Sequence, residues 1–149
     1  MKEYIVQNQE RWNRVSRRQA NPYTIPYSHE ELQRLKEKPI EVALTVGKLV
    51  PLTWFEKAQG NRLLGLACGG GQQGPIFALH GYETTIMDFS EAQLSKDQEV
   101  TDQENFLINT IQADMTKPFP FEDNSFDIIF CPVSNVYVEG LDNMYHEAY

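Results

Sequence analysis

The stretch LLGLACGGGQQGP, residues 63–75, runs from an apolar segment directly into four glycines within six residues. The apolar residues 62–67 predict a buried strand, and the glycines after them predict a tight turn. A helix should follow over PIFALH, because Pro75 suits the first position of a helix. Glycines in the turn permit positive φ angles and close approach of a ligand to the backbone. We therefore expect a strand–turn–helix unit whose turn faces a ligand.

The segments after this unit repeat the alternation of strand and helix. ETTIMDF (83–89), LINTIQAD (107–114) and FDIIFCP (126–132) predict strands, and LDNMYHEAY (141–149) predicts a helix. Ser90 and Gln93 form a capping-box pattern for a helix that runs to about residue 105. This order predicts an α/β fold, a Rossmann-like doubly wound parallel sheet in three αβα layers. Ligands of such sheets bind at the carboxyl ends of the strands.

The first part of the chain has a different pattern. Residues 3–19 predict an amphipathic helix, with docking side chains at Ile5, Val6, Trp12 and Val15. The prolines of NPYTIP end it, and Ser28 with Glu31 forms a capping box for a second helix. We therefore divide the chain into a mainly helical N-terminal lid segment, 1–59, and a Rossmann-like core, 60–149.

Composition excludes several classes of partner. The 21 acidic and 13 basic residues give a net charge of −8, which argues against a nucleic-acid backbone as partner. The two cysteines have no metal-ligand spacing, no cluster of acids and histidines suggests a metal, and a reducing cytoplasmic location fits best. No apolar run of about 18 residues and no leader pattern is present, so we expect neither a membrane span nor a signal peptide.

The glycines match a known nucleotide-binding fingerprint. Their spacing is Gly69-x-Gly71-x-x-Gly74, and Asp88 follows roughly 20 residues later at the end of the second strand. A carboxylate there would bind ribose hydroxyls. The fingerprint does not choose between nicotinamide dinucleotides and S-adenosylmethionine, because both carry adenosine. A glycine-rich tight turn with an ordinary surface aspartate is the remaining alternative.

A wider set of segments narrows the choice. LLGLACGGGQQGP, TTIMDFSEAQL, IQADMTKPFPFEDNSFDIIFCPVSNVYV and MYHEAY together resemble the class I S-adenosylmethionine-dependent methyltransferases, over residues 60–149. The sequence is most similar to the methyltransferase-11-like bacterial small-molecule branch. The resemblance implies S-adenosylmethionine as cofactor and a seven-stranded sheet that is truncated here after the fourth strand. The fourth strand would then be an exposed edge, and the chain would either associate through it as a homo-oligomer or be marginally stable.

The resemblance also implies roles for residues near the turn. Ala67, Gly69 and Gly71 would lie under the methionine part and the ribose, and Asp88 would bind both ribose hydroxyls. Two positions depart from the family pattern, which usually has an acid at Gly65 and glycine at Ala67. The missing acid puts the affinity for the cofactor in question more than binding itself.

Four further residues are assigned by the same resemblance. Phe89 would flank the adenine ring, and Asp114 would accept a hydrogen bond from the adenine amino group, with Met115 beside it. The backbone at Cys131 would meet the methionine end of the cofactor. Phe89 and Met115 as plain core, Asp114 as a turn cap and Cys131 as a small buried residue are the alternatives.

The function implied is methyl transfer to a small-molecule acceptor. A catalytically silent S-adenosylmethionine-binding module and a nicotinamide-dependent oxidoreductase are the alternatives, although the latter usually needs a Tyr-x-x-x-Lys pair that the sequence lacks. No candidate general base has a diagnostic spacing; the candidates are His29, His80, His146, Tyr23, Tyr27 and Tyr137. We expect His80 to be a capping or surface residue and His146 to be exposed; for Tyr23 and Tyr27, simple packing and a role in covering the site are the alternatives.

Overall fold

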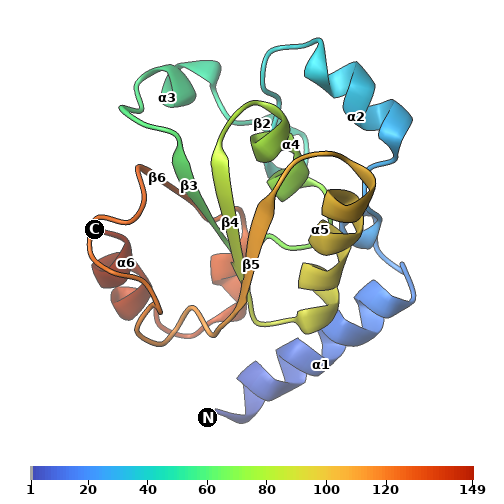
Figure 1. The fold of residues 1–149 in the computed structure, drawn as a ribbon. Helices are drawn as coiled ribbons and strands as arrows, with labels where there is room; N and C mark the ends of the chain where they lie inside the picture. The colour runs from blue at the N-terminus through green and yellow to red at the C-terminus, as the bar shows by residue number, and fades with distance from the viewer. Residues whose placement is uncertain (1) are drawn as a thin grey trace.

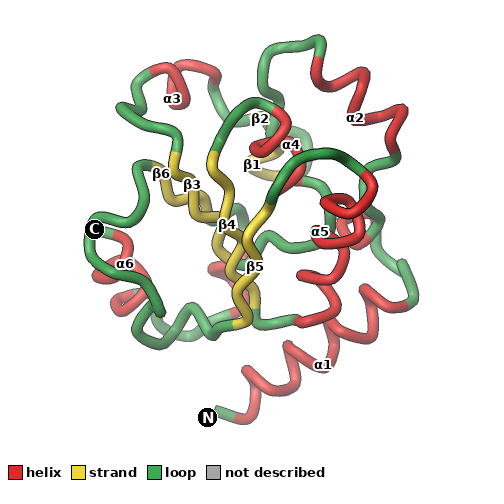
Figure 2. The backbone as a smooth tube through the Cα atoms, viewed as in Figure 1, coloured by secondary structure: helices red, strands yellow, loops and turns green. Residues whose placement is uncertain are grey.

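Four parallel strands form the central sheet, in the order β5-β4-β3-β6. The computed structural model describes residues 2–149 (Figure 1, Figure 2). The strands are β3 (Arg62–Leu66), β4 (Glu83–Asp88), β5 (Ile108–Gln112) and β6 (Ile128–Phe130). All three pairings are parallel, so the carboxyl ends of the strands meet at one edge. The α/β class and the doubly wound arrangement predicted from the sequence are confirmed.

Helices cover both faces of this sheet, as Figure 1 shows. The chain continues from β3 into α4 (Gln73–Leu79), from β4 into α5 (Glu91–Gln103), and from β6 into η2 (Ser134–Tyr137) and α6 (Asp142–Ala148). Neighbouring strand residues point to opposite faces. Leu63 and Ile86 therefore pack in the cluster that includes α4, whereas Leu64 and Met87 pack with Met144 of α6. The two apolar layers enclose the sheet.

The N-terminal elements pack around the same core. They are α1 (Glu3–Arg17), η1 (Pro22–Thr24), α2 (His29–Lys36), the hairpin β1 (Ala43–Thr45) and β2 (Lys48–Leu49), and α3 (Leu52–Glu56). The capping box predicted for α2 is confirmed, because Ser28 and Glu31 exchange both hydrogen bonds. Val42 and Val50, which flank the hairpin, are buried in the cluster that contains Leu63.

Helix α1 docks through the predicted apolar face, apart from Val6, and through polar side chains: Ile5 is buried, and Trp12 and Val15 are half-buried. Val6 is 36% exposed, and only Ile5 and Ser16 of this helix are buried. The Ser16 hydroxyl donates to the carbonyl of Ala92 on α5 over 2.9 Å, and α1 lies alongside α5 in Figure 1. The apolar pattern identified the helix, and hydrogen bonds to the start of α5 help to fix its position.

Two predicted helix starts also differ in detail. Helix α4 begins at Gln73, so Pro75 is its third residue rather than its first. Proline is tolerated there because the first N–H groups of a helix have no partner within the helix. At α5, Ser90 caps Gln93 as predicted, but the Gln93 side chain does not return to the cap. It donates instead to the carbonyl of Gly69 over 3.0 Å.

Strand β6 pairs only with β3 among the described residues, so the expected exposed edge is present. Association of two copies through this edge stays a prediction.

Candidate functional site

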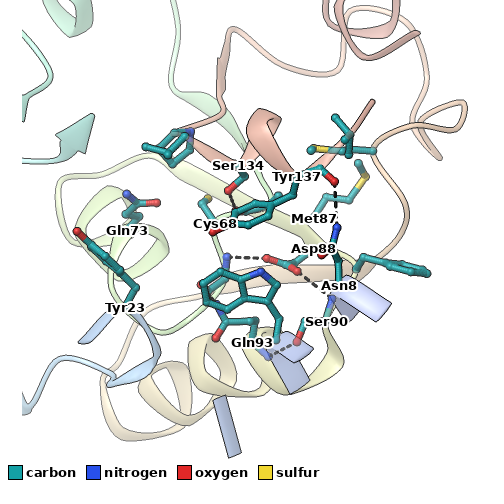
Figure 3. A pocket seen from close by; sticks show the side chains of 18 of the residues that line it. Asn8, Tyr23, Cys68, Gln73, Met87, Asp88, Ser90, Gln93, Ser134 and Tyr137 are labelled. Carbon is teal, nitrogen blue, oxygen red and sulfur yellow. Dashed lines mark hydrogen bonds between the residues drawn. The ribbon is translucent and has the colours of Figure 1, made fainter. Parts of the chain in front are cut away.

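A cavity of about 240 Å³ opens at the carboxyl ends of the strands (Figure 3). Its floor comes from the residues that follow β3, β4, β5 and β6. Its roof comes from α1, Tyr23 and the tip of the β1–β2 hairpin. Six of the eight predicted cofactor residues line it: Ala67, Gly69, Asp88, Phe89, Asp114 and Met115. The fold therefore brings residues spread over 49 positions of sequence, from 67 to 115, into one site.

Asp88 lies at the end of β4 and is tied to the backbone on both sides. One carboxylate oxygen accepts from the Ser90 N–H over 2.8 Å, and the other accepts from the Gly69 N–H over 3.1 Å. Removal from solvent raises the pKa of Asp88 to about 6, although these N–H groups act to lower it. Asp88 thus joins the start of α5 to the glycine loop, residues 67–74, and still faces the cavity (Figure 3).

Asp114, which follows β5 and lines the cavity, carries an unpaired acceptor. Its Oδ1 accepts from the N–H of Thr116 over 2.9 Å and from its hydroxyl over 2.7 Å, so this oxygen does cap a turn. Its Oδ2 is buried and has no partner among the described residues. A buried polar atom without a partner is costly, so a donor group of a ligand would satisfy it. Phe89 and Met115 supply apolar surface next to it.

The glycine loop meets the fingerprint's expectation of positive φ at one of its three glycines, Gly71, while Gly69 and Gly74 have ordinary φ angles. Gly70 and Gly71 have φ angles of +132° and +76°, in the region that favours glycine. A Cβ at Gly70 would lie 2.3 Å from the carbonyl oxygen of Tyr23. Ala67 also has a positive φ, +49°, at the position where the resemblance expects glycine.

Two of the predicted residues do not line the cavity. The Gly71 carbonyl accepts from the N–H of Tyr27 over 2.9 Å, so Gly71 holds the N-terminal segment against the loop. Cys131 packs in the cluster that contains Leu64, and burial raises the pKa of its thiol to about 11. Its neighbours from Pro132 to Ser134 line the cavity in its place. The thiol of Cys131 is therefore neutral at ordinary pH.

Helix α1 closes the roof by contacts to two loops. The Gln9 carboxamide donates to the carbonyl of Phe89 over 2.8 Å, and that of Asn8 donates to Tyr137 over 3.0 Å. The indole ring of Trp12 meets the ring of Tyr137 edge-on, with 5.8 Å between centroids. These four side chains line the cavity, but the sequence assigned no binding role to Asn8, Gln9 or Trp12. The amphipathic pattern of residues 3–19 was the one signal in the sequence that this helix packs against the core.

The candidate general bases separate into two groups. Tyr23 and Tyr137 line the cavity, whereas Tyr27 packs in the core and its pKa is raised by burial. The histidines lie elsewhere: His80 bonds the carbonyls of Ile76 and Lys38, as expected for a helix-end residue, and His29 pairs with Glu104. His146 is exposed on α6.

The remaining wall carries no charge. It comes from the hairpin residues 43–46, from Gln72 and Gln73, and from Ser134. Among the described residues that line the cavity, Asp88 and Asp114 carry the ionisable carboxylates. Over residues 2–149, no group of acids, histidines and cysteines is placed to hold a metal ion. None of the helices in the described chain is long and apolar enough to span a membrane.

Known proteins share this sequence and fold. A family model described as a methyltransferase domain matches residues 64–149. The uncharacterized methyltransferase YbaJ of Bacillus subtilis (strain 168) is 34% identical over all 149 residues, which make up 58% of its length. The PH0226 protein of Pyrococcus horikoshii OT3 aligns in structure with a TM-score of 0.62 and 27% identity, over 87% of this chain and 57% of that one.

A more distant relative shares the fold alone. A Methanococcus maripaludis protein (mmp1179), assigned by its name to the S-adenosyl-L-methionine-dependent methyltransferases, aligns with a TM-score of 0.59 at 15% identity. The alignment covers 100% of this chain and 59% of that one. This chain thus spans between half and two thirds of each of these relatives. Because the family model covers more than half of the chain, beginning in β3 and including the glycine loop and Asp88, the chain belongs to the methyltransferase domain family.

Proposed function

We propose that this chain binds S-adenosylmethionine and forms the cofactor-binding part of an enzyme that methylates a neutral small molecule. One observation carries the proposal. Asp88, residues of the glycine loop and Asp114, which carries a buried oxygen without a partner among the described residues, line a single cavity at the strand ends where an adenosine would need them. Family membership implies the same cofactor. The nicotinamide-dependent alternative finds no support in these relatives.

The residues present fit the parts of this cofactor. Asp88 is the acceptor for the two ribose hydroxyls, and the Asp114 Oδ2 is the acceptor for the adenine amino group. Phe89 and Met115 would flank the adenine ring, and Ala67 and Gly69 would lie beneath the methionine part. Trp12 and Gln9 from α1 would cover the ribose side, since both line the roof. Residues 1–59 act in this proposal as the lid of the core, 60–149.

The chemistry needs position more than acid–base groups. S-adenosylmethionine supplies, when bound, an electrophilic methyl group on a sulfonium. The chain then has to hold a nucleophile in line with that group and to exclude water, and orientation of this kind can contribute roughly 7–11 kcal/mol. Tyr23, Leu44 and Val46 present aromatic and apolar surface beside the glycine loop. This uncharged wall favours a neutral acceptor over a phosphate or a carboxylate.

The test is calorimetric titration with S-adenosylmethionine, S-adenosylhomocysteine and NADH in parallel. We expect both sulfur ligands to bind and NADH not to bind. Asp88→Asn should weaken binding at least about tenfold, because charge-assisted hydrogen bonds to the ribose are lost. Asp123→Asn is the matched control, since this acid is exposed and lies before β6. Binding of NADH alone would overturn the proposal.

Binding and turnover separate the enzyme from a silent binding module. The partial length of the chain relative to YbaJ gives the silent alternative its basis. Release of S-adenosylhomocysteine from S-adenosylmethionine, measured with a panel of neutral thiols, phenols and amines, would demonstrate transfer. Tight binding without release for any acceptor, also in a version extended to the relative's full length, would favour the silent module.

A further inference from the structure

Helix α5 reaches the glycine loop with two buried polar side chains that lie one turn apart. The Gln93 carboxamide donates to the carbonyl of Gly69 over 3.0 Å. The carboxylate of Asp97 accepts from the N–H of Gly70 over 3.1 Å. The exposed fraction is 6% for Gln93 and 0% for Asp97. Residues four apart share one face of a helix. Gln93 and Asp97 therefore bind two consecutive residues of the loop, Gly69 and Gly70.

The loop has no comparable support from the strand that leads into it. Gly65 of β3 has no room for a side chain, because an added Cβ would lie 2.5 Å from the Cys68 sulfur and 2.6 Å from Ile86 Cδ1. An acid at this position would displace both neighbours. The carboxylates that accept from the loop N–H groups come from other elements: Asp88 ends β4, and Asp97 belongs to α5.

Burying the Asp97 carboxyl costs free energy, which its hydrogen bond with the loop has to offset. No Lys, Arg or His pairs with it among the described residues, and its Oδ1 has no hydrogen-bond partner. Loss of hydration and the nearby charge of Asp88 raise the pKa of Asp97 to about 8, against the effect of the loop N–H groups. Cys68 is the other titratable group near it. An apolar residue at this position would avoid the free-energy cost of burying a carboxyl group. The hydrogen bond from the Gly70 N–H is the interaction that offsets this cost.

Gly70 is the residue whose orientation most needs fixing. Its φ of +132° is strained for any other residue, and the carbonyl of Tyr23 lies where a Cβ would be. Without an acceptor, its buried N–H would be unsatisfied and the peptide plane free to turn. The neighbouring Gly69 N–H is held by Asp88. Two acids on two elements thus fix two consecutive N–H groups of the loop.

We propose that Gln93 and Asp97 are positioning residues that hold Gly69 and Gly70 in the shape that receives the cofactor, and so set cofactor affinity from helix α5. The inference rests on the proposed function for the identity of the ligand. The shape of the loop itself is independent of any ligand and can be tested without one.

The experiment compares Asp97→Ala, Asp97→Asn and Gln93→Ala in the full chain. Hydrogen exchange of the Gly70 amide, followed by NMR without ligand, reports the loop directly. We expect Asp97→Ala to speed this exchange at least about tenfold, and Asp97→Asn to preserve it, because the carboxamide oxygen still accepts from Gly70. Asp102→Asn is the control, since this acid is exposed on the same helix.

Titration with S-adenosylhomocysteine gives the second readout. Asp97→Ala and Gln93→Ala should each weaken binding by roughly tenfold, with rescue to within about threefold by Asp97→Asn. If Asp97→Ala does not fold, the affinity of Gln93→Ala still tests the proposal, because this variant removes the hydrogen bond to the Gly69 carbonyl.

The outcomes distinguish the two proposals. Unchanged exchange and affinity in both alanine variants would overturn the positioning role, as would an Asp97→Asn variant as weak as Asp97→Ala. If the wild-type chain bound no sulfur ligand, the proposed function would fail. The exchange data would then still show whether Asp97 fixes the loop, and the claim about affinity would be refuted.

Discussion

The hydroxyl of Ser134 donates a hydrogen bond of 2.6 Å to the carbonyl of Ala67, which joins the loop after β6 to the loop after β3. A residue with left-handed backbone lies at each end of this bond: Ala67 has a φ of +49°, and Val133, next to Ser134, has a φ of +51°. Both line the cavity. Strain of this kind costs on the order of 1–3 kcal/mol per residue and concentrates at functional sites. The wall of the cavity is therefore held in a shape that its own backbone disfavours.

Replacing Ala67 by glycine should relieve part of this strain. We expect Ala67→Gly to raise the free energy of unfolding by about 1 kcal/mol, because glycine adopts positive φ without a Cβ penalty. Urea unfolding measures the change. Gly81→Ala is the reverse control: Gly81 has a φ of +86° and open space around it, so the variant should lose about 1 kcal/mol. A destabilised Ala67→Gly variant would show that the Ala67 methyl group contributes more by packing than it costs in strain.

The two buried acids predict how stability depends on pH. The folded chain has a pKa of about 6 at Asp88 and about 8 at Asp97, both above the ordinary aspartate value of 3.8. The folded state thus binds more protons than the unfolded state above pH 4, and the free energy of unfolding falls as pH rises. The fall due to Asp88 ends near pH 6, and that due to Asp97 near pH 8.

Urea unfolding at constant ionic strength between pH 5 and 8.5 tests this trend. Asp97→Asn should flatten the curve between pH 6 and 8. Asp127, which Arg62 holds at a pKa of about 2, acts with the opposite sign but only below pH 4. Stability that rose from pH 6 to pH 8 would contradict the burial of Asp97.

Asn13 of the lid helix makes two hydrogen bonds to the start of α5. The Asn13 carboxamide oxygen accepts from the Ser90 hydroxyl over 2.7 Å and from the Ala92 N–H over 3.2 Å. Asn13→Ala should lower the free energy of unfolding by about 1–2 kcal/mol, because it leaves both donors unpaired. Arg17→Ala should change stability little, since the ion pair of Arg17 with Glu91 is exposed. Equal effects of the two variants would mean that α1 is held by charge instead.

Trp12 should report ligand binding through its fluorescence. The chain has two tryptophans, and Trp54 is 58% exposed and does not line the cavity. Trp54→Phe therefore leaves Trp12, beside Tyr137, as the only indole. We expect S-adenosylhomocysteine to change its emission in a saturable way. The same titration of Trp12→Phe should give no change, and a change there would place the ligand away from the roof.

Much of the core could be predicted because local forces determine it. The apolar run before Gly69 and the glycine spacing predicted β3, the loop and α4, and Asp88 was placed at the end of β4. The box of Ser28 and Glu31 formed as predicted, because both bonds lie within one turn. The similar pattern at Ser90 and Gln93 formed only half of its bonds. A stronger partner, the Gly69 carbonyl, lies 24 positions away in sequence and is invisible to a local pattern.

The α/β class, the glycine turn and the acid after the second strand of the sheet could be predicted from the sequence, because periodicity, glycine conformation and helix caps act over a few neighbouring residues. The family followed from the resemblance of longer segments to known methyltransferases. Tertiary structure decided which side chains enclose the cavity. Tyr137 is 129 positions from Asn8, and Asp97 is 27 from Gly70, yet each pair is hydrogen-bonded. Parallel strands bring such distant segments to one edge of a sheet. In that place Asp97, which the sequence shows only as one more helix residue, is buried and accepts a hydrogen bond from the loop at Gly70.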